Sequence, residues 1–130
     1  MEKAVAGIVL YKDKVLIGKK IVKEGHFVSG GWHIPGGHIL VNESEEEALI
    51  REFKEETSLD IKISEKITRC NIPRVETVVN WYLCETESDN YIPGDDLEEV
   101  KFVPKDKVLE ECDSRAVELW PEEVIKFFLS

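Results

Sequence analysis

Apolar runs near the start of the chain are short and are cut by charged residues. β-branched and aliphatic residues dominate positions 4–11 and 15–19, and a Lys-Asp-Lys tripeptide at 12–14 separates them. Two short β-rich runs joined by a few polar residues are typical of a β-hairpin. We therefore expect two antiparallel strands, followed over 20–31 by a polar, glycine-containing loop.

Further strands are predicted from the same kind of pattern. A short run at 32–34 precedes the first predicted helix, and the later runs are rich in β-branched and aromatic residues. They cover 61–67, 77–85 and 100–103, the last ended by Pro104. The segment between the last two, residues 85–99, reads ETESDNYIPGDDLEE and is expected to be turn and loop.

Two segments have the periodicity of helices. Ser44 followed by Glu47 matches a capping box, which predicts a helix that begins near Glu45. A second helix is expected after Pro121, a favoured residue of a first helical turn, since an apolar face follows it. The apolar stripe of the first helix is predicted to consist of Ile50, Phe53 and Thr57, with Leu49 at its margin.

Three carboxylates of the first helix share one face. At about 100° per residue, Glu52, Glu55 and Glu56 lie within an arc of about 100°. Like charges at this spacing repel by roughly a few tenths of a kcal/mol per pair, so a bound cation is expected to offset the cost. Mg²⁺ or Mn²⁺ fits, because such hard ions bind carboxylates together with substrate phosphates. The alternative is a solvated, charged helix surface without a ligand.

Two neighbouring features favour the metal site. Arg51 lies four residues from both Glu47 and Glu55, so it can pair with either and hold a glutamate rotamer. Upstream, Pro35-Gly36-Gly37 ends the short strand with two residues free to adopt positive φ, which lets a bare backbone approach a ligand. A bare backbone beside an acidic helix suits phosphate binding.

Residues 37–59 resemble the Nudix box, G-x5-E-x7-R-E-U-x-E-E-x-G-U, in which U is aliphatic or aromatic. The matching positions are Gly37, Glu43, Arg51, Glu52, Phe53, Glu55, Glu56 and Leu59. Ser58 departs from the pattern, since the family has glycine where the chain leaves the helix. We expect a left-handed backbone there, with a strain of about 1 kcal/mol and no loss of activity.

The resemblance extends to the preceding WxxPGG and to the order of strands, and it implies the fold and the chemistry. The expected class is α/β, with the Nudix fold of a mixed β-sheet sandwiched between helices (α/β/α). The implied activity is that of a MutT-like, Mg²⁺- or Mn²⁺-dependent pyrophosphohydrolase. Glu52, Glu55 and Glu56 are then expected to hold the metal together with the carbonyl of Gly37, and one of the glutamates to act as base. With Arg51, these glutamates are the candidate catalytic residues.

Charged residues outside the box are candidates for substrate contacts or for the base. Lys19 and Lys20 leave the second strand where family members often place a cation against the substrate phosphates; a solvated pair is the alternative. Glu98, Glu99 and Glu76 lie in regions from which some members recruit a further glutamate, and ordinary surface acids are the alternative.

Aromatic and polar residues offer weaker candidates for binding a base. His33 is a candidate substrate contact, and Trp32, Phe27 and Trp81 can stack on a base, although aromatics in strands more often belong to the core. Residues 113–115, Asp-Ser-Arg, lie where some family members read the base. Glu43, by resemblance, has a structural role as a loop anchor.

The resemblance leaves the substrate open. The small size favours a nucleoside triphosphate cleaved to the monophosphate and pyrophosphate, because ADP-ribose hydrolases of this family usually carry an additional N-terminal segment. Pro73 lies near the position where ADP-ribose enzymes place a proline, so ADP-ribose or another nucleotide sugar is the alternative. A non-catalytic nucleotide sensor is the second functional class, and the intact set of glutamates argues against it.

Composition agrees with a single domain over residues 1–130. A net charge of −10 argues against binding nucleic acid or an anionic membrane surface, which leaves a small nucleotide as the expected partner. Three separated cysteines, with no CxxC pattern, indicate reduced thiols in the cytoplasm. The first apolar run is cut off before the roughly 20 residues that a membrane span requires. A monomer and a homodimer remain equally open.

Overall fold

The structure is a computed structural model that describes residues 2–25 and 27–130. Its strands are β1 (Glu2–Tyr11), β2 (Lys14–Lys20), β3 (Trp32–His33), β4 (Gly36–His38), β5 (Lys62–Ile72), β6 (Thr77–Glu85) and β7 (Leu97–Pro104). Its helices are α1 (Glu45–Thr57), α2 (Val108–Glu111), α3 (Ser114–Val117) and α4 (Glu122–Leu129), with a 3-10 turn at Lys105–Lys107.

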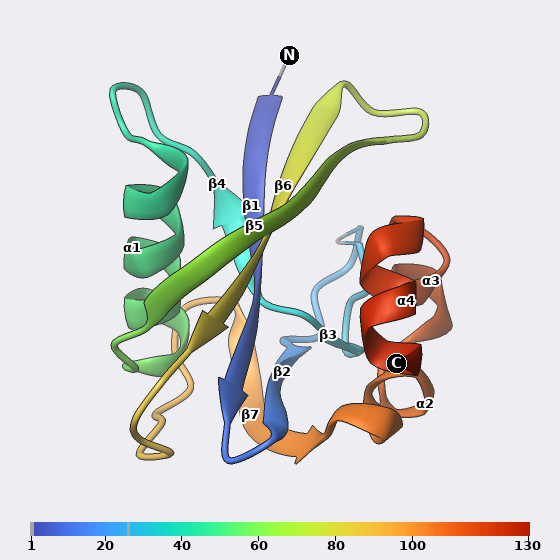
Figure 1. Ribbon diagram of the computed structural model, residues 1–130. Coiled ribbons are helices and arrows are strands. Elements are labelled where there is room, and N and C mark those ends of the chain that lie inside the picture. The colour runs from blue at the N-terminus through green and yellow to red at the C-terminus, as the bar shows by residue number, and fades with distance from the viewer. Residues whose placement is uncertain (1, 26) are drawn as a thin grey trace.

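The strands form one mixed sheet. Its order is β3-β2-β1-β6-β5, with β4 paired to β1 and β7 paired to β2. β1 and β6 run parallel, with Ala6 opposite Trp81, whereas β4 and β2 run antiparallel to β1. Helix α1 covers one face of the sheet, and α2, α3 and α4 gather on the other side (Figure 1). The predicted α/β/α arrangement is confirmed.

The β1–β2 connection is the tight hairpin that the sequence predicts. Lys12 and Asp13 both have positive φ, of 48° and 65°, and Tyr11 pairs with Lys14. Two central residues with positive φ are the mark of a type I′ turn, whose twist matches that of the flanking strands. The two strands diverge beyond this turn, and β3 pairs with the far end of β2, at Gly18 and Lys19. Strand β7 pairs along the whole length of β2.

Both ends of α1 match the predictions. The Ser44 hydroxyl accepts from the backbone N–H of Glu47 at 3.1 Å, and the Glu47 carboxylate accepts from the N–H of Ser44 at 2.9 Å, which completes the capping box. At the other end Ser58 adopts φ 64° and ψ 9°, and its N–H donates to the Lys54 carbonyl. The expected left-handed position is therefore occupied by serine.

The buried stripe of α1 differs from the prediction at two positions, since Leu49, expected at its margin, is central and Ile50, expected within it, is exposed. Leu49 and Phe53 are fully buried against β1, and Thr57 is buried with them, but Ile50 is 45% exposed. On the helical wheel Leu49 and Phe53 are 40° apart and set the contact direction, from which Ile50 points too far to reach the sheet. Glu56 lies on the other flank of this direction, and the sheet buries it.

Three further expectations are corrected. The segment expected to be only a turn contains β4, in which Gly36 pairs with Ala6 and Gly37 with Val5. The loop before the last strand ends earlier than predicted, so Glu98 and Glu99 belong to β7. Helices α2 and α3 were not predicted, because four-residue helices are too short to show periodicity.

The three cysteines are free thiols, as expected. Among the described residues, no helix is both long and apolar enough to cross a membrane.

Candidate metal site

Three carboxylates from two separate segments meet beside α1. Glu52 and Glu55 come from the helix and Asp95 from the loop between β6 and β7, and one oxygen of each lies within 4.8 Å of the others. Glu55 and Asp95 are exposed, whereas the Glu52 side chain is only 13% exposed. Three anionic groups at this distance repel one another, and a shared cation removes that repulsion.

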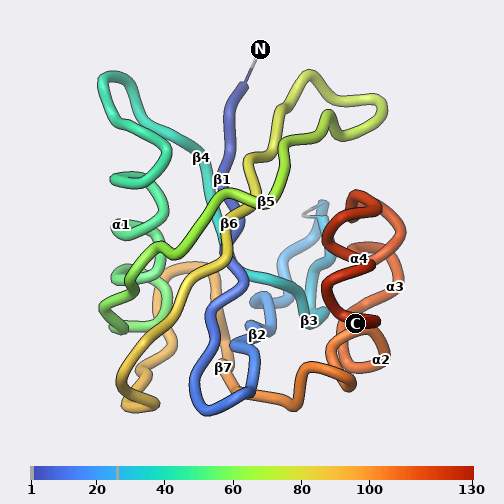
Figure 2. The backbone as a smooth tube through the Cα atoms, in the orientation of Figure 1, coloured from blue at the N-terminus to red at the C-terminus, as the bar shows by residue number. Residues whose placement is uncertain are grey.

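Backbone hydrogen bonds hold the β6–β7 loop against the end of α1. Ile92 N–H donates to the Thr57 carbonyl at 2.8 Å, and Gly94 N–H donates to the Glu56 carbonyl at 3.0 Å. Carbonyls of a last helical turn have no partner within the helix, so the loop satisfies them. Figure 2 shows this loop passing beside the lower end of α1. The carboxylate of Asp95, a residue of this loop, therefore reaches those of Glu52 and Glu55.

Glu56 carries a buried carboxyl group with one unpaired oxygen. The residue is 4% exposed, and its Oε1 has no hydrogen-bond partner within residues 2–25 and 27–130. Burial, with a smaller contribution from the charges of Glu52 and Asp95, raises the pKa of Glu56 to about 9. A buried carboxyl without a partner is costly, and a cation placed at this cluster would supply the missing interaction.

The backbone of Gly37 lies directly against the carboxylate of Glu52. A Cβ atom at Gly37 would overlap the carboxylate of Glu52, so only glycine permits this approach. The strand β4 fixes this position by pairing Gly37 with Val5. Burial also raises the pKa of Glu52, although the neighbouring Arg51 guanidinium opposes the shift.

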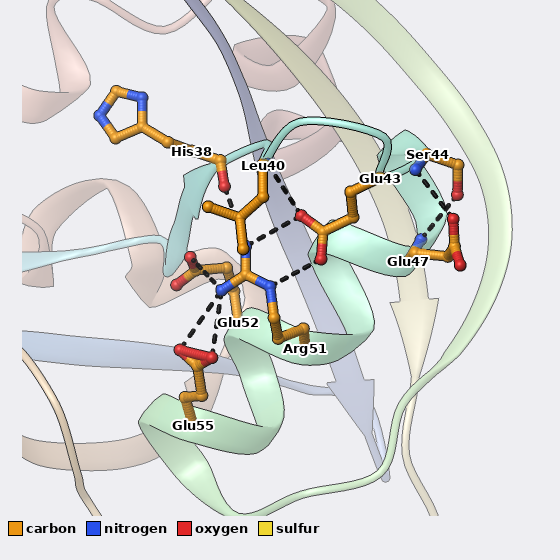
Figure 3. A network of polar contacts seen from close by, with 8 residues as sticks. All are labelled: His38, Leu40, Glu43, Ser44, Glu47, Arg51, Glu52 and Glu55. Carbon is orange, nitrogen blue, oxygen red and sulfur yellow. Dashed lines mark hydrogen bonds and ion pairs between the residues drawn. The ribbon is translucent and has the colours of Figure 1, made fainter.

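Arg51 ties the acidic residues together (Figure 3). Its Nη1 donates to Glu52 at 3.0 Å and to Glu55 at 3.1 Å, and its Nη2 donates to the His38 carbonyl at 3.0 Å. Its remaining donors engage Glu43, upstream of the helix. Of the two predicted partners four residues away, Glu55 is bound and Glu47 is not among the contacts of Arg51, since Glu47 closes the capping box.

These residues fit a hard divalent cation. The donors are carboxylate oxygens, the ligand type that Mg²⁺ and Mn²⁺ prefer. Of the predicted set, Glu52 and Glu55 converge with Asp95, and the backbone of Gly37 lies against Glu52. Glu56 is not one of the three converging carboxylates. The charges of Glu52 and Asp95 nevertheless act on it, and its buried Oε1 has no partner among the described residues. Asp95 was missed, because nothing in a polar loop sequence shows that it folds back onto α1.

The two lysines at the end of β2 make contacts of their own. Lys19 Nζ lies 3.7 Å from Glu98, and Glu99 is opposite Lys19 in the pairing of β2 with β7. Lys20 Nζ donates to the Phe27 carbonyl at 3.3 Å, and its charge lowers the pKa of Glu56 slightly against the larger effect of burial. Glu98 and Glu99 are not part of the acidic cluster, which takes Asp95 from the preceding loop.

His33 is held within the sheet. Its Nδ1 lies 2.9 Å from the Gly18 carbonyl and donates to it, and burial lowers the pKa of His33 to about 4. The ring is therefore neutral at physiological pH. Of the aromatic candidates, Trp81 is buried against Trp120, while Phe27 is exposed.

The segment at 113–115 is partly helical and is internally paired. Asp113 caps α3 by accepting from the N–H of Arg115, and the two side chains form an ion pair at 2.7 Å. These bonds to Arg115 lower the pKa of Asp113 to about 2. The N–H of Asp113 donates to the Trp32 carbonyl, which joins this segment to β3.

The family of the chain follows from a comparison with known domains. The model of the NUDIX domain matches residues 1–124, which is nearly the whole sequence. The chain belongs to the NUDIX domain family.

Individual relatives agree with this assignment. An ADP-ribose pyrophosphatase from Methanocaldococcus jannaschii is 31% identical over 103 residues, which cover 76% of this chain and 59% of that protein. The chain thus spans less than two thirds of the length of this curated relative. A MutT/nudix family protein from Enterococcus faecalis is 32% identical, with a TM-score of 0.68 over 78% of this chain and 42% of that one. A MutT protein from Methanosarcina mazei shares the fold, with a TM-score of 0.73, 21% identity and coverage of 98% and 90%.

Proposed function

We propose that this chain is a divalent-metal-dependent hydrolase that cleaves the diphosphate linkage of a nucleoside diphosphate joined to another group. The observation that carries the proposal is the convergence of Glu52, Glu55 and Asp95 beside the buried, partnerless carboxyl of Glu56. Membership of the NUDIX domain family supports the reaction class.

The roles of the residues follow from their contacts. A bound divalent cation would neutralise charge on the phosphates and would orient them for attack by water. Glu52, Glu55 and Asp95 would hold it, joined by Glu56 and by the carbonyl of Gly37, whose backbone lies against Glu52. Arg51 keeps Glu52 and Glu55 in place through its hydrogen bonds. One carboxylate of the set accepts the proton of the attacking water.

Two substrates of this class are to be distinguished. A nucleoside triphosphate is the substrate expected from the resemblance to MutT-like proteins. ADP-ribose is supported by a specific observation, since the relative from M. jannaschii is described as an ADP-ribose pyrophosphatase. Both contain the diphosphate linkage that the acidic site would bind.

The test is a substrate panel with and without a chelator. The purified protein is incubated with (deoxy)nucleoside triphosphates, ADP-ribose, nucleotide sugars and dinucleoside polyphosphates in Mg²⁺ or Mn²⁺, and products are separated by chromatography. We expect release of a nucleoside monophosphate that stops when the metal is chelated. Pyrophosphate as second product identifies a nucleoside triphosphate pyrophosphohydrolase, and ribose 5-phosphate identifies an ADP-ribose hydrolase.

A matched pair of variants ties the activity to the site. Glu55→Gln removes a carboxylate of the cluster, and Glu46→Gln removes an exposed carboxylate of the same helix outside it. Turnover should fall by orders of magnitude in the first and remain near normal in the second. Nucleotide binding without turnover under any metal would instead indicate a sensor domain.

A further inference from the structure

Gly94 approaches α1 more closely than any residue with a side chain could. A Cβ atom built on Gly94 would lie 2.7 Å from the backbone carbonyl oxygen of Glu55. Its N–H meanwhile donates to the next carbonyl, that of Glu56, at 3.0 Å. Gly94 does not have a positive φ, so close approach, and not backbone conformation, accounts for glycine here.

This contact sets the position of the next residue. Asp95 follows Gly94 directly and has a left-handed backbone, with φ of 52°, which turns the chain sharply after the contact with the helix. Its carboxylate reaches within 4.8 Å of the carboxylates of Glu52 and Glu55. The loop is tied down on both sides of Gly94, since Ile92 N–H donates to the Thr57 carbonyl and Leu97 N–H donates to the Gly94 carbonyl.

We infer that Gly94 is a positioning residue of the metal site, which places Asp95 against Glu52 and Glu55 by letting the β6–β7 loop dock on the last turn of α1. This inference rests on the proposed function, because it assumes that the carboxylate cluster binds a divalent cation. The steric argument itself does not depend on metal binding, because a Cβ at Gly94 would meet backbone atoms that cannot move away without disturbing the helix.

Adding a Cβ at Gly94 should displace Asp95, the proposed metal ligand that follows it. In Gly94→Ala the loop must move away from α1 by several tenths of an ångström, and the 3.0 Å hydrogen bond to Glu56 lengthens. Asp95 moves with the loop, whereas Glu52 and Glu55 stay on the helix. Displacing a supporting contact of a metal ligand lowers metal affinity by about ten-fold or more.

A double-mutant cycle on Mn²⁺ affinity tests the inference. The free Mn²⁺ signal is titrated by electron paramagnetic resonance for the wild type, Gly94→Ala, Asp95→Asn and the double variant. Asparagine tolerates a left-handed backbone, so Asp95→Asn removes the charge and keeps the turn. Ile92→Ala is the loop control, because its side chain is 66% exposed and its N–H is retained.

We expect Gly94→Ala and Asp95→Asn each to weaken Mn²⁺ binding about ten-fold. The double variant should bind Mn²⁺ no more weakly than Asp95→Asn alone, because both changes remove the same ligand. Ile92→Ala should bind Mn²⁺ normally. Circular dichroism and Tm confirm that each variant is folded. Wild-type affinity in folded Gly94→Ala, or losses that multiply in the double variant, would overturn the positioning role.

The two hypotheses fail in different ways. If Asp95→Asn weakens binding and Gly94→Ala does not, the inference on Gly94 fails and the metal site stands. If the wild type binds no Mn²⁺, the proposed function fails, and the role of Gly94 fails with it.

Discussion

Arg51 and Glu43 form a bidentate ion pair across the start of α1. Nε of Arg51 donates to one carboxylate oxygen of Glu43 at 2.7 Å, and Nη2 donates to the other at 3.0 Å (Figure 3). Glu43 also accepts from the N–H of Leu40 at 2.9 Å, which fixes the loop between β4 and α1. The hydrogen bonds from Arg51 lower the pKa of Glu43, and those from Glu43 raise the pKa of Arg51.

This geometry predicts that lysine cannot replace Arg51. A single ammonium group cannot donate to Glu43, Glu52 and Glu55 at once, although it keeps the charge. Arg51→Lys should lower kcat/KM by about ten-fold or more, the cost of losing contacts that orient metal ligands. Steady-state kinetics on the substrate identified in the panel measures the effect. Lys54→Arg, on the exposed side of the same helix, is the control, and equal rates for the two variants would contradict the role.

The buried carboxyl of Glu56 makes the stability of the metal-free protein depend on pH. Its folded-state pKa of about 9 lies above the ordinary glutamate value of 4.5, so the folded state holds a proton that the unfolded state releases. The wild type should therefore lose stability as the pH rises from about 4.5 to about 9. Glu56→Gln removes this dependence, so the stability of the variant relative to the wild type should increase by about 2 to 3 kcal/mol between pH 5 and pH 7.

Urea unfolding in the presence of a chelator measures this difference. Glu46→Gln is the control, since its side chain is exposed and its unfolding curve should shift little with pH relative to the wild type. Added Mg²⁺ should restore stability to the wild type and not to Glu56→Gln. Parallel pH profiles for Glu56→Gln and the wild type would show that Glu56 is ionised without a metal.

Ser58 is expected to carry a removable strain. It holds φ of 64° at the end of α1, a conformation that costs about 1 kcal/mol for a residue with a side chain. Ser58→Gly relieves this cost but increases the freedom of the unfolded chain, so the free energy of unfolding should rise by roughly 0 to 1 kcal/mol. Activity should not change. Thermal and urea unfolding check the stability, and a loss of more than about 1 kcal/mol would contradict the strain.

A side chain at position 37 should impair metal binding by the site. Alanine at this position places a Cβ against the carboxylate of Glu52, so either β4 or the glutamate must move. Gly37→Ala should weaken Mn²⁺ binding by about ten-fold or more while the far-UV circular dichroism is retained. Normal Mn²⁺ affinity in this variant would show that Glu52 can bind the ion from another rotamer.

Local signals made much of the fold predictable. The capping box at Ser44 and Glu47, and the polar break after Tyr11, act through neighbouring residues, so the sequence shows them directly. Register between distant strands is different. The pairing of Gly37 with Val5 that turns an expected loop into β4 depends on where β1 lies in the sheet.

The candidate site divides in the same way. Glu52, Glu55 and Glu56 share one helix, so their spacing alone predicts that they meet. The burial of Glu56 could also have been predicted from the sequence, because Glu56 lies seven residues after Leu49 and three after Phe53, next to the buried stripe. The position of Asp95 could not be predicted from the sequence, since it depends on hydrogen bonds between a loop and the end of a helix almost forty positions earlier.

The position of the metal ion tests the account most directly. A crystal of the wild-type protein soaked in Mn²⁺ gives an anomalous difference map in which the ion can be located without reference to the protein atoms. We predict a strong peak about 2 Å from carboxylate oxygens of Glu52, Glu55 and Asp95, with Glu56 turned toward it. A map with no peak at this cluster, or with the ion bound elsewhere, would contradict the assignment of these residues as the metal site.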